Sequence, residues 1–244
     1  MGTFNKHQTK LLFLCISGSK AYGTNTADSD TDLRGVFVNQ DPNDILGITE
    51  FAEEVRTNPD SSLFELRKFV RLALQGNTIA CESMWVKPEE VTPLGQQLLD
   101  MRDSFLSMRF VDVFRGYAIS EHRKTVGVVS GALGEKRKEL IKKYGYSVKN
   151  ATQCLRLLWQ GTILAKTGQV EVYISDDEKR AEMIAVKTGQ VPINEYILLR
   201  EKYLADFEQA VRQPRLPHSP NSQKIWNWVC EVYRNELISS GSQE

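Results

Sequence analysis

The 244-residue sequence lacks several features that would assign it at once to a class of protein. No apolar run approaches the roughly 20 residues of a transmembrane helix, so we expect no membrane span. No signal-peptide pattern is recognisable, because the first apolar run is too short, and the expected location is therefore the cytoplasm. The chain also has no internal repeat and no low-complexity tract.

Neither charge nor cysteine content points to a partner. Lys plus Arg and Asp plus Glu number 31 each, so the net charge gives no argument for a nucleic-acid partner, and a basic surface would have to be local. The cysteines form no C-x-x-C pair and each stands among apolar residues, so we expect buried free thiols in a reducing compartment. They are Cys15, Cys81, Cys154 and Cys230.

What the sequence does have is a chemically distinctive stretch near its N-terminus. The apolar run Leu11–Ile16 predicts a buried strand, and the small residues Ser17, Gly18 and Ser19 that follow it predict a tight turn. Such a turn lets backbone N–H groups approach a phosphate without obstruction by side chains.

Two carboxylates, Asp30 and Asp32, follow this turn and precede the apolar run Val36–Val38. Residues i and i+2 of a strand point to the same face, so the two carboxylates would stand side by side and repel each other. A divalent cation relieves that repulsion, and Mg²⁺ prefers oxygen ligands together with substrate phosphates. Such stretches are often solvated turns, but the flanking apolar runs favour a site for phosphoryl or nucleotidyl transfer.

The string GSKAYGT…SDTDLRGVFV resembles the G-S…D-x-D signature of the DNA polymerase β-like nucleotidyltransferase superfamily. It is most similar to the RNA-repair-pathway polymerase β branch, common in bacteria and their phages, because Tyr22, Gly23, Arg34 and Gly35 also fit. The fold class we expect is α+β. A small mixed-sheet nucleotidyltransferase core over residues 1–93 would be followed by an all-helical substrate-binding region over residues 94–244.

The hydrophobic pattern beyond the motif predicts a third strand and then mainly helices. The strand is expected over Glu50–Thr57 and a helix over Leu63–Leu74, where Ser62 and Glu65 fit a capping box. Further helices are predicted over 96–123, 150–167, 176–188, 193–212 and 222–239.

Sites of this superfamily usually add a third carboxylate, which binds metal or accepts the proton of the attacking hydroxyl. Asp60 is favoured because the branch tends to carry an Asp just before an L-x-K-F element, here Leu66–Phe69. Asp60 could instead cap the helix that follows. Glu53, Glu65 and Glu82 are the other candidates; Glu65 suits the capping box, and Glu82 matches an acidic position of the branch.

The resemblance implies transfer of a nucleoside monophosphate from an NTP to a hydroxyl, with release of pyrophosphate. Asp30, Asp32 and Asp60 would be the catalytic residues and would bind Mg²⁺ or Mn²⁺. Lys149 and Arg156 lie on roughly one helical face and could neutralise a triphosphate, or could equally be solvated surface charges. The full set of expected nucleotide contacts is Gly18, Ser19, Ser29, Lys68, Lys149 and Arg156.

The family name implies RNA, either tRNA or a damaged RNA end, as the acceptor. One alternative is nucleotidylation of a protein or small molecule, and another is a non-catalytic RNA- or nucleotide-binding module with a vestigial site. The intact Gly18, Ser19, Asp30 and Asp32 argue against the last alternative. Gln153 leaves room for it, because we expect many relatives to have His at this position. The sequence does not specify which NTP is used or the oligomeric state.

Overall fold

The computed structural model of the chain describes residues 8–57, 60–127 and 135–241. These residues form two compact units, each discontinuous in sequence. The first unit comprises the described residues up to Ala21, then Asp28–Ser107, and those from Ser219 onward; the second comprises Tyr22–Ala27 and Met108–His218. Among the described helices, none is both long enough and apolar enough to cross a membrane. The functional division predicted at residue 93 stays a prediction.

The first unit is built on a mixed sheet, in which the described strands follow the order β3-β4-β2-β1-β5. β2 and β4 run parallel, and the other neighbouring pairs run antiparallel. The strands are β1 (Thr9–Ser17), β2 (Asp32–Asn39), β3 (Glu53–Thr57), β4 (Asp60–Glu65) and β5 (Pro88–Val91). The predicted α+β class with a small mixed sheet is confirmed.

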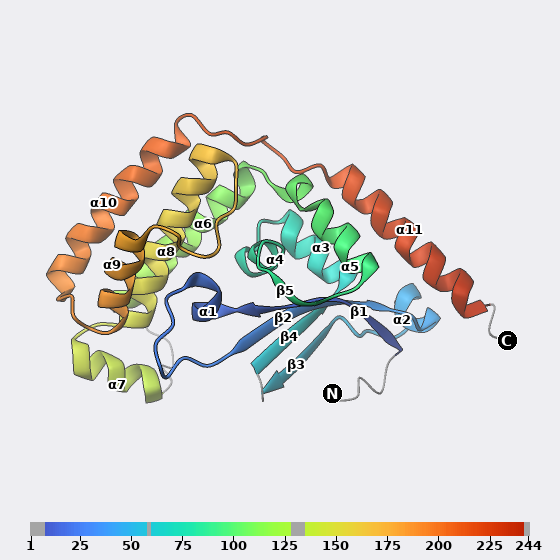
Figure 1. The fold of residues 1–244 in the computed structure, drawn as a ribbon, viewed down its shortest axis with the longest axis horizontal. Coiled ribbons are helices and arrows are strands. Elements are labelled where there is room, and N and C mark those ends of the chain that lie inside the picture. The colour runs from blue at the N-terminus through green and yellow to red at the C-terminus, as the bar shows by residue number, and fades with distance from the viewer. Residues whose placement is uncertain (1–7, 58–59, 128–134, 242–244) are drawn as a thin grey trace. The chain divides into compact units, whose positions relative to one another are not determined.

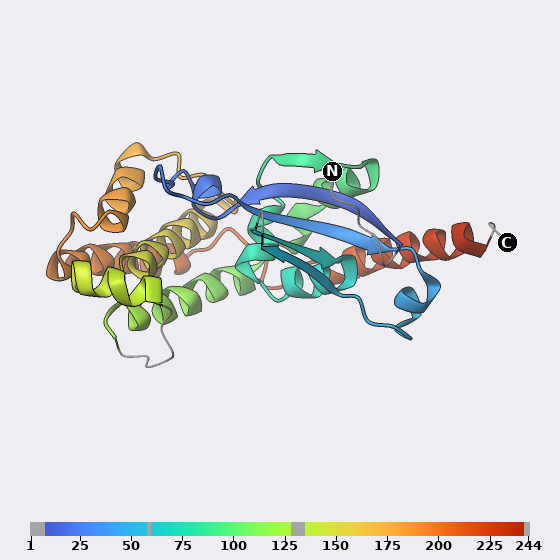
Figure 2. The same cartoon turned by 90° about the horizontal axis from the view of Figure 1, so that it is seen from below.

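Helices α3, α4 and α5 of this unit lie together on one side of the sheet (Figure 1), and Figure 2 shows the sheet from the other side. Phe13 of β1 meets Phe69 of α3 edge to face, with ring centroids 5.9 Å apart, so this helix and the sheet share one apolar core. The helices are α1 (Gly18–Tyr22), which continues into the second unit, α2 (Pro42–Leu46), α3 (Leu66–Leu74), α4 (Thr78–Ser83), α5 (Pro93–Asp100), the 3-10 helix η1 (Arg102–Phe105) and α11 (Ser222–Gly241).

The prediction of a helix over Leu63–Leu74 is wrong at its start, because Ser62 and Leu63 belong to β4. Helix α3 begins only at Leu66, and Glu65 is its N-cap, with the carboxylate accepting a hydrogen bond from the Lys68 backbone N–H at 3.1 Å. Leu63 fits both a helical stripe and the buried side of a strand. Its pairing with the distant strand β2 decides between the two.

The second unit is helical, and α8 is its centre. This helix packs against α6, α9 and α10 and is buried along most of its length. Gly161 allows α10 to approach closely, because a Cβ at this position would overlap the Phe207 ring. The helices are α6 (Met108–Thr125), α7 (Glu135–Tyr144), α8 (Val148–Thr167), α9 (Asp177–Lys187) and α10 (Ile193–Val211).

Two further expectations are corrected by these elements. The single helix predicted over Gln96–Arg123 is divided into α5, η1 and α6, and Ser107, between η1 and α6, is the last residue before the chain enters the second unit. Cys230 is exposed on α11, whereas the other three thiols are buried as predicted. The buried stripe of α11 includes Ile225 and Val229, and Cys230 lies beside this stripe rather than in it.

Candidate functional site

The turn and the second aspartate of the motif are in direct contact. Ser17, at the end of β1, is the register partner of Asp32, the first residue of β2. Gly18 follows with φ +67°, and a Cβ built on it would overlap the Asp32 carboxylate. Glycine is therefore needed here both for the left-handed backbone and for the close approach of the carboxylate.

A second carboxylate, Asp60, lies beside Asp32. Asp60 is the first residue of β4 and pairs in register with Asp32 across the parallel β2–β4 ladder. Neighbouring strands lie about 4.8 Å apart, and register-matched residues share a face of the sheet. Asp60 is exposed and does not cap α3, since Glu65 has that role. The structure thus brings the predicted second and third carboxylates together.

Asp30 is placed differently from the prediction. It is exposed and stands before β2, which begins only at Asp32, so strand pairing does not fix its side chain next to that of Asp32. Ser29 precedes it and is half-buried. The expectation that Asp30 and Asp32 are neighbours on one strand is therefore wrong.

The donor set at this site suits a hard divalent cation. Mg²⁺ is commonly bound by one or two carboxylates and completes its shell with substrate phosphates and water. Within the ranges that the structure describes, no three or more His, Cys, Asp or Glu side chains form a preformed metal site. Asp32 and Asp60 side by side, next to the turn at Gly18, fit a cation that arrives together with a nucleotide.

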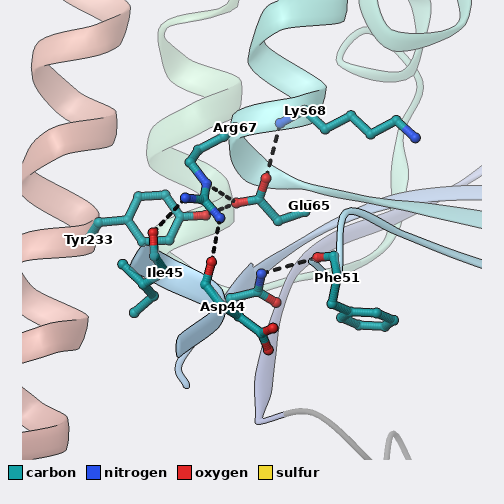
Figure 3. Close-up of polar contacts among 8 residues, drawn as sticks. Asp44, Ile45, Phe51, Glu65, Arg67, Lys68 and Tyr233 are labelled. Atoms are coloured by element: carbon teal, nitrogen blue, oxygen red, sulfur yellow. Dashed lines mark hydrogen bonds and ion pairs between the residues drawn. The ribbon is translucent and has the colours of Figure 1, made fainter. Parts of the chain in front are cut away.

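Glu65, another candidate for the third carboxylate, is buried in a structural network (Figure 3). Its carboxylate accepts from Arg67 Nε at 3.0 Å and from the hydroxyl of Tyr233 on α11. Arg67 also donates to the carbonyl oxygens of Ile45 at 2.6 Å and Asp44 at 2.8 Å. Burial and then the Glu65 charge raise the pKa of Tyr233, so the phenol remains a donor. The carboxylate of Glu65 is thus occupied in joining α11 to the sheet.

The remaining acidic candidates do not stand at the register position of Asp32. Glu53 on β3 pairs with Phe64 and forms an ion pair with Lys68. The Lys68 ammonium also lies 5.5 Å from the centroid of the Phe64 ring, so its charge is engaged at β3 and β4. Glu82 is buried in α4. Of the four candidates, Asp60 is the one that pairs with Asp32.

Lys20 is a residue near the motif that sequence analysis missed. It lies on α1, and its ammonium donates to the hydroxyl of Thr31, which stands between Asp30 and Asp32. A positive charge is thus held at the segment that carries both aspartates. The one feature of the sequence that could have indicated a role for Lys20 is its position inside the string GSKAYGT, which resembles the family.

Lys149 and Arg156, the predicted cationic pair, belong to α8 of the second unit. Lys149 is exposed, whereas Arg156 is only 2% exposed and so is not a solvated surface charge. Arg156 Nε donates to Gln153 Oε1 at 3.1 Å, and Nη1 donates to Gln160. The guanidinium carbon lies 3.9 Å from the centroid of the Tyr22 ring, a contact that contributes about 2 kcal/mol where the cation is desolvated.

Comparison with known proteins assigns the chain to a family. The model of the RNA repair pathway DNA polymerase beta family matches residues 3–230. The chain belongs to this family. A search of curated proteins finds no match. Among solved structures, the nucleotidyltransferase-like protein from Exiguobacterium sibiricum 255-15 is similar, with 10% identity over 83% of this chain and 69% of that chain. The TM-score of this comparison is 0.33.

In this polymerase β family member, the segment Tyr22–Ala27 between the turn and the aspartates is part of the second unit. Lys187 at the end of α9 donates to the Thr24 carbonyl oxygen at 2.7 Å. Burial and then the charge of Lys149 lower the pKa of Lys187. Lys187 was not expected from the sequence, because nothing local distinguishes it from other helical lysines.

Proposed function

We propose that this polymerase β family member is a metal-dependent nucleotidyltransferase, which moves a nucleoside monophosphate from an NTP to a hydroxyl and releases pyrophosphate. The observation that carries the proposal is the in-register pairing of Asp32 with Asp60, with Gly18 directly against the Asp32 carboxylate. Membership of the family supports the same reaction class.

In this proposal Asp30 and Asp32 would hold Mg²⁺ or Mn²⁺, and Asp60 would either complete the metal site or accept the proton of the attacking hydroxyl. When bound, the metal would neutralise the triphosphate and lower the pKa of the hydroxyl. The backbone N–H groups at Gly18 and Ser19 bind the β- and γ-phosphates.

Three lysine side chains would add positive charge at the substrate, and Ser29 would make a polar contact with the nucleotide. Lys20 is held at Thr31, next to the aspartates, and would balance their charge before the substrate binds. Lys68 would exchange its Glu53 partner for a phosphate oxygen, and Lys149 would contact the triphosphate or the acceptor. The core region 1–93 would thus perform the chemistry, and the helical region 94–244 would bind substrate.

The acceptor we propose is RNA, either tRNA or a damaged RNA end, because the family is described by an RNA repair pathway. The test incubates the full chain with each α-³²P-labelled NTP, Mg²⁺ or Mn²⁺, and a pool of total RNA. The double variant D30A/D32A runs in parallel, with circular dichroism to show that it is folded. Label on RNA and release of pyrophosphate in the wild type alone are the expected results.

A matched control removes two carboxylates elsewhere in the same unit. Glu89 and Glu90 are exposed on β5, which pairs with β1 at Phe13–Cys15 and not with β2 or β4, the strands that carry Asp32 and Asp60, so E89A/E90A should transfer label at the wild-type rate.

Label on the protein itself would move the function to protein nucleotidylation. Metal-dependent NTP binding without transfer or pyrophosphate release would indicate a vestigial binding module, and transfer by D30A/D32A would refute the proposed site.

A further inference from the structure

Three helices of the second unit bring their ends together around the start of α8. Tyr144, the last residue of α7, lies directly against Gly189, two residues beyond the end of α9, because a Cβ on Gly189 would overlap the Tyr144 ring. The Tyr146 hydroxyl, in the link between α7 and α8, donates to the Val191 carbonyl oxygen at 2.7 Å. The end of α7, the start of α8 and the end of α9 therefore meet in one region of this unit.

Four lysines stand at these helix ends, and we call them the lysine patch. Lys142 and Lys143 lie in the last turn of α7, Lys149 in the first turn of α8 and Lys187 at the end of α9. The first three are exposed, and Lys187 is half-buried. The Lys143 ammonium lies 4.9 Å from the centroid of the half-buried Tyr144 ring. Cations beside an aromatic ring are the combination that binds the backbone and bases of single-stranded nucleic acid.

The charges of the patch are not balanced by neighbouring carboxylates. Elsewhere in this unit lysines have acidic partners, as in the ion pair of Lys179 with Glu182 at 3.0 Å on α9. Over the described residues, by contrast, no carboxylate forms an ion pair with Lys142, Lys143 or Lys149. An anion from outside the chain can therefore bind these three side chains without displacing an internal partner.

Helix stability does not account for the position of Lys149. The N-terminal end of a helix carries a positive partial charge, so a cation in the first turn of α8 is unfavourable, whereas Lys142 and Lys143 are favourable in the last turn of α7. Burial and then the Lys149 charge lower the pKa of Lys187, so the two ammonium groups also repel each other. A phosphate bound at Lys149 would relieve both costs.

We propose that the lysine patch binds the phosphodiester backbone of the RNA acceptor. This inference rests on the proposed function and assigns Lys149 to the acceptor rather than to the triphosphate. Because lysine is a flexible point charge without a planar hydrogen-bonding fork, the patch binds phosphates and does not read the base sequence. The accessible part of the Tyr144 ring can stack on an unpaired base, which favours single-stranded RNA over a duplex.

The test measures binding of a short fluorescein-labelled single-stranded RNA to the full chain by fluorescence anisotropy, without NTP or metal, between about 50 and 200 mM KCl. For a single strand, each neutralised phosphate contributes about 0.7 to the slope of log affinity against log salt concentration. The patch variant K142A/K143A/K149A should therefore have a slope smaller by about 2, and it should bind at least about tenfold more weakly at the lower salt concentration.

The matched control, K166A/K202A/R212A, removes three exposed cations elsewhere in the same unit and should bind like the wild type. Circular dichroism establishes that both triple variants are folded. Equal losses of affinity in the two variants would overturn the proposal, because only net charge would then matter. Absence of RNA binding by the wild type would also overturn it, as would patch-dependent binding to phosphatidylglycerol vesicles in place of RNA.

Binding needs no turnover, so this test and the transfer assay can fail separately. The variant D30A/D32A should bind the RNA at least as tightly as the wild type. RNA binding through the patch without transfer by the wild type would refute the proposed function and leave the patch in place. Transfer by the wild type together with undiminished RNA binding by the patch variant would refute the patch alone.

Discussion

Asp32 and Asp60 are register partners on two parallel strands that lie far apart in the sequence. Two carboxylates at this spacing repel each other, and a divalent cation relieves the repulsion. Mutual repulsion also means that neutralising one of them should not destabilise the fold.

The variant D60N should therefore keep or slightly raise the melting temperature while reducing nucleotide transfer about a hundredfold or more, as expected for loss of a metal ligand. Mg²⁺ or Mn²⁺ together with an NTP should raise the melting temperature of the wild type more than that of D60N, because the wild type binds the metal–nucleotide pair more tightly in its folded state. Thermal unfolding with and without metal and NTP checks the statements about melting temperature, and transfer of labelled nucleotide checks the loss of activity. Full activity in D60N would assign the third carboxylate elsewhere.

The contact between Gly18 and Asp32 leads to a second prediction. G18A should lose activity and about 1–2 kcal/mol of stability from the left-handed backbone alone, with further loss from overlap with the carboxylate. G47A is the matched control, because Gly47 has φ +76° but nothing within 4 Å of its added Cβ. Chemical denaturation of both variants separates the backbone cost from the overlap. Equal losses of stability and activity in the two variants would contradict a specific role for Gly18.

The network of Glu65 predicts a stability effect without a catalytic one. Y233F removes a donor from a buried carboxylate and should cost about 1–3 kcal/mol, whereas E65A removes both the ion-pair partner of Arg67 and the N-cap of α3 and should cost about 3 kcal/mol. Urea unfolding measures both losses. Transfer per folded molecule should stay near that of the wild type in each variant. A hundredfold loss of kcat in folded E65A would place Glu65 in the active site.

Thiol reactivity gives a fourth prediction. Burial raises the pKa of Cys15 to about 12, and it also raises the pKa values of Cys81 and Cys154, so these thiols stay protonated and inaccessible at pH 8. Cys230 is exposed. A disulfide reagent such as DTNB should modify one thiol of the native protein at once and the others only on unfolding. C230S should abolish the fast phase, and its persistence would mean that another thiol is accessible.

The motif around Gly18 and Asp32 was predictable because its chemistry is local. A glycine that must adopt a positive φ and an aspartate at the start of a strand leave a recognisable string of residues. The partner of Asp32 was harder to establish, since the identity of the third carboxylate depends on β4. Residues 63–65 read as the start of a helix, and only pairing with β2 makes them a strand. Local periodicity carries no information about such long-range pairing.

Arg156 shows a second limit of prediction from the sequence. Its spacing from Lys149 indicated a shared helical face and suggested exposed charge, but α8 is packed on several sides and buries the guanidinium. Burial of a cation becomes tolerable because two glutamine amides and the Tyr22 ring surround it. Tyr22 lies more than a hundred positions away in the chain, so the residues near Arg156 in the sequence do not predict the contact.

The link between Tyr233 of α11 and Glu65 beside the sheet has a consequence for biosynthesis. The first unit contains both the strands made early in translation and the helix Ser222–Gly241 made late. During synthesis the carboxylate of Glu65 lacks the hydrogen bond from the Tyr233 phenol until almost all the described residues have been translated. A nascent chain stalled before α11 therefore holds a sheet with an incomplete polar network, in which the Glu65 carboxylate lacks the Tyr233 donor.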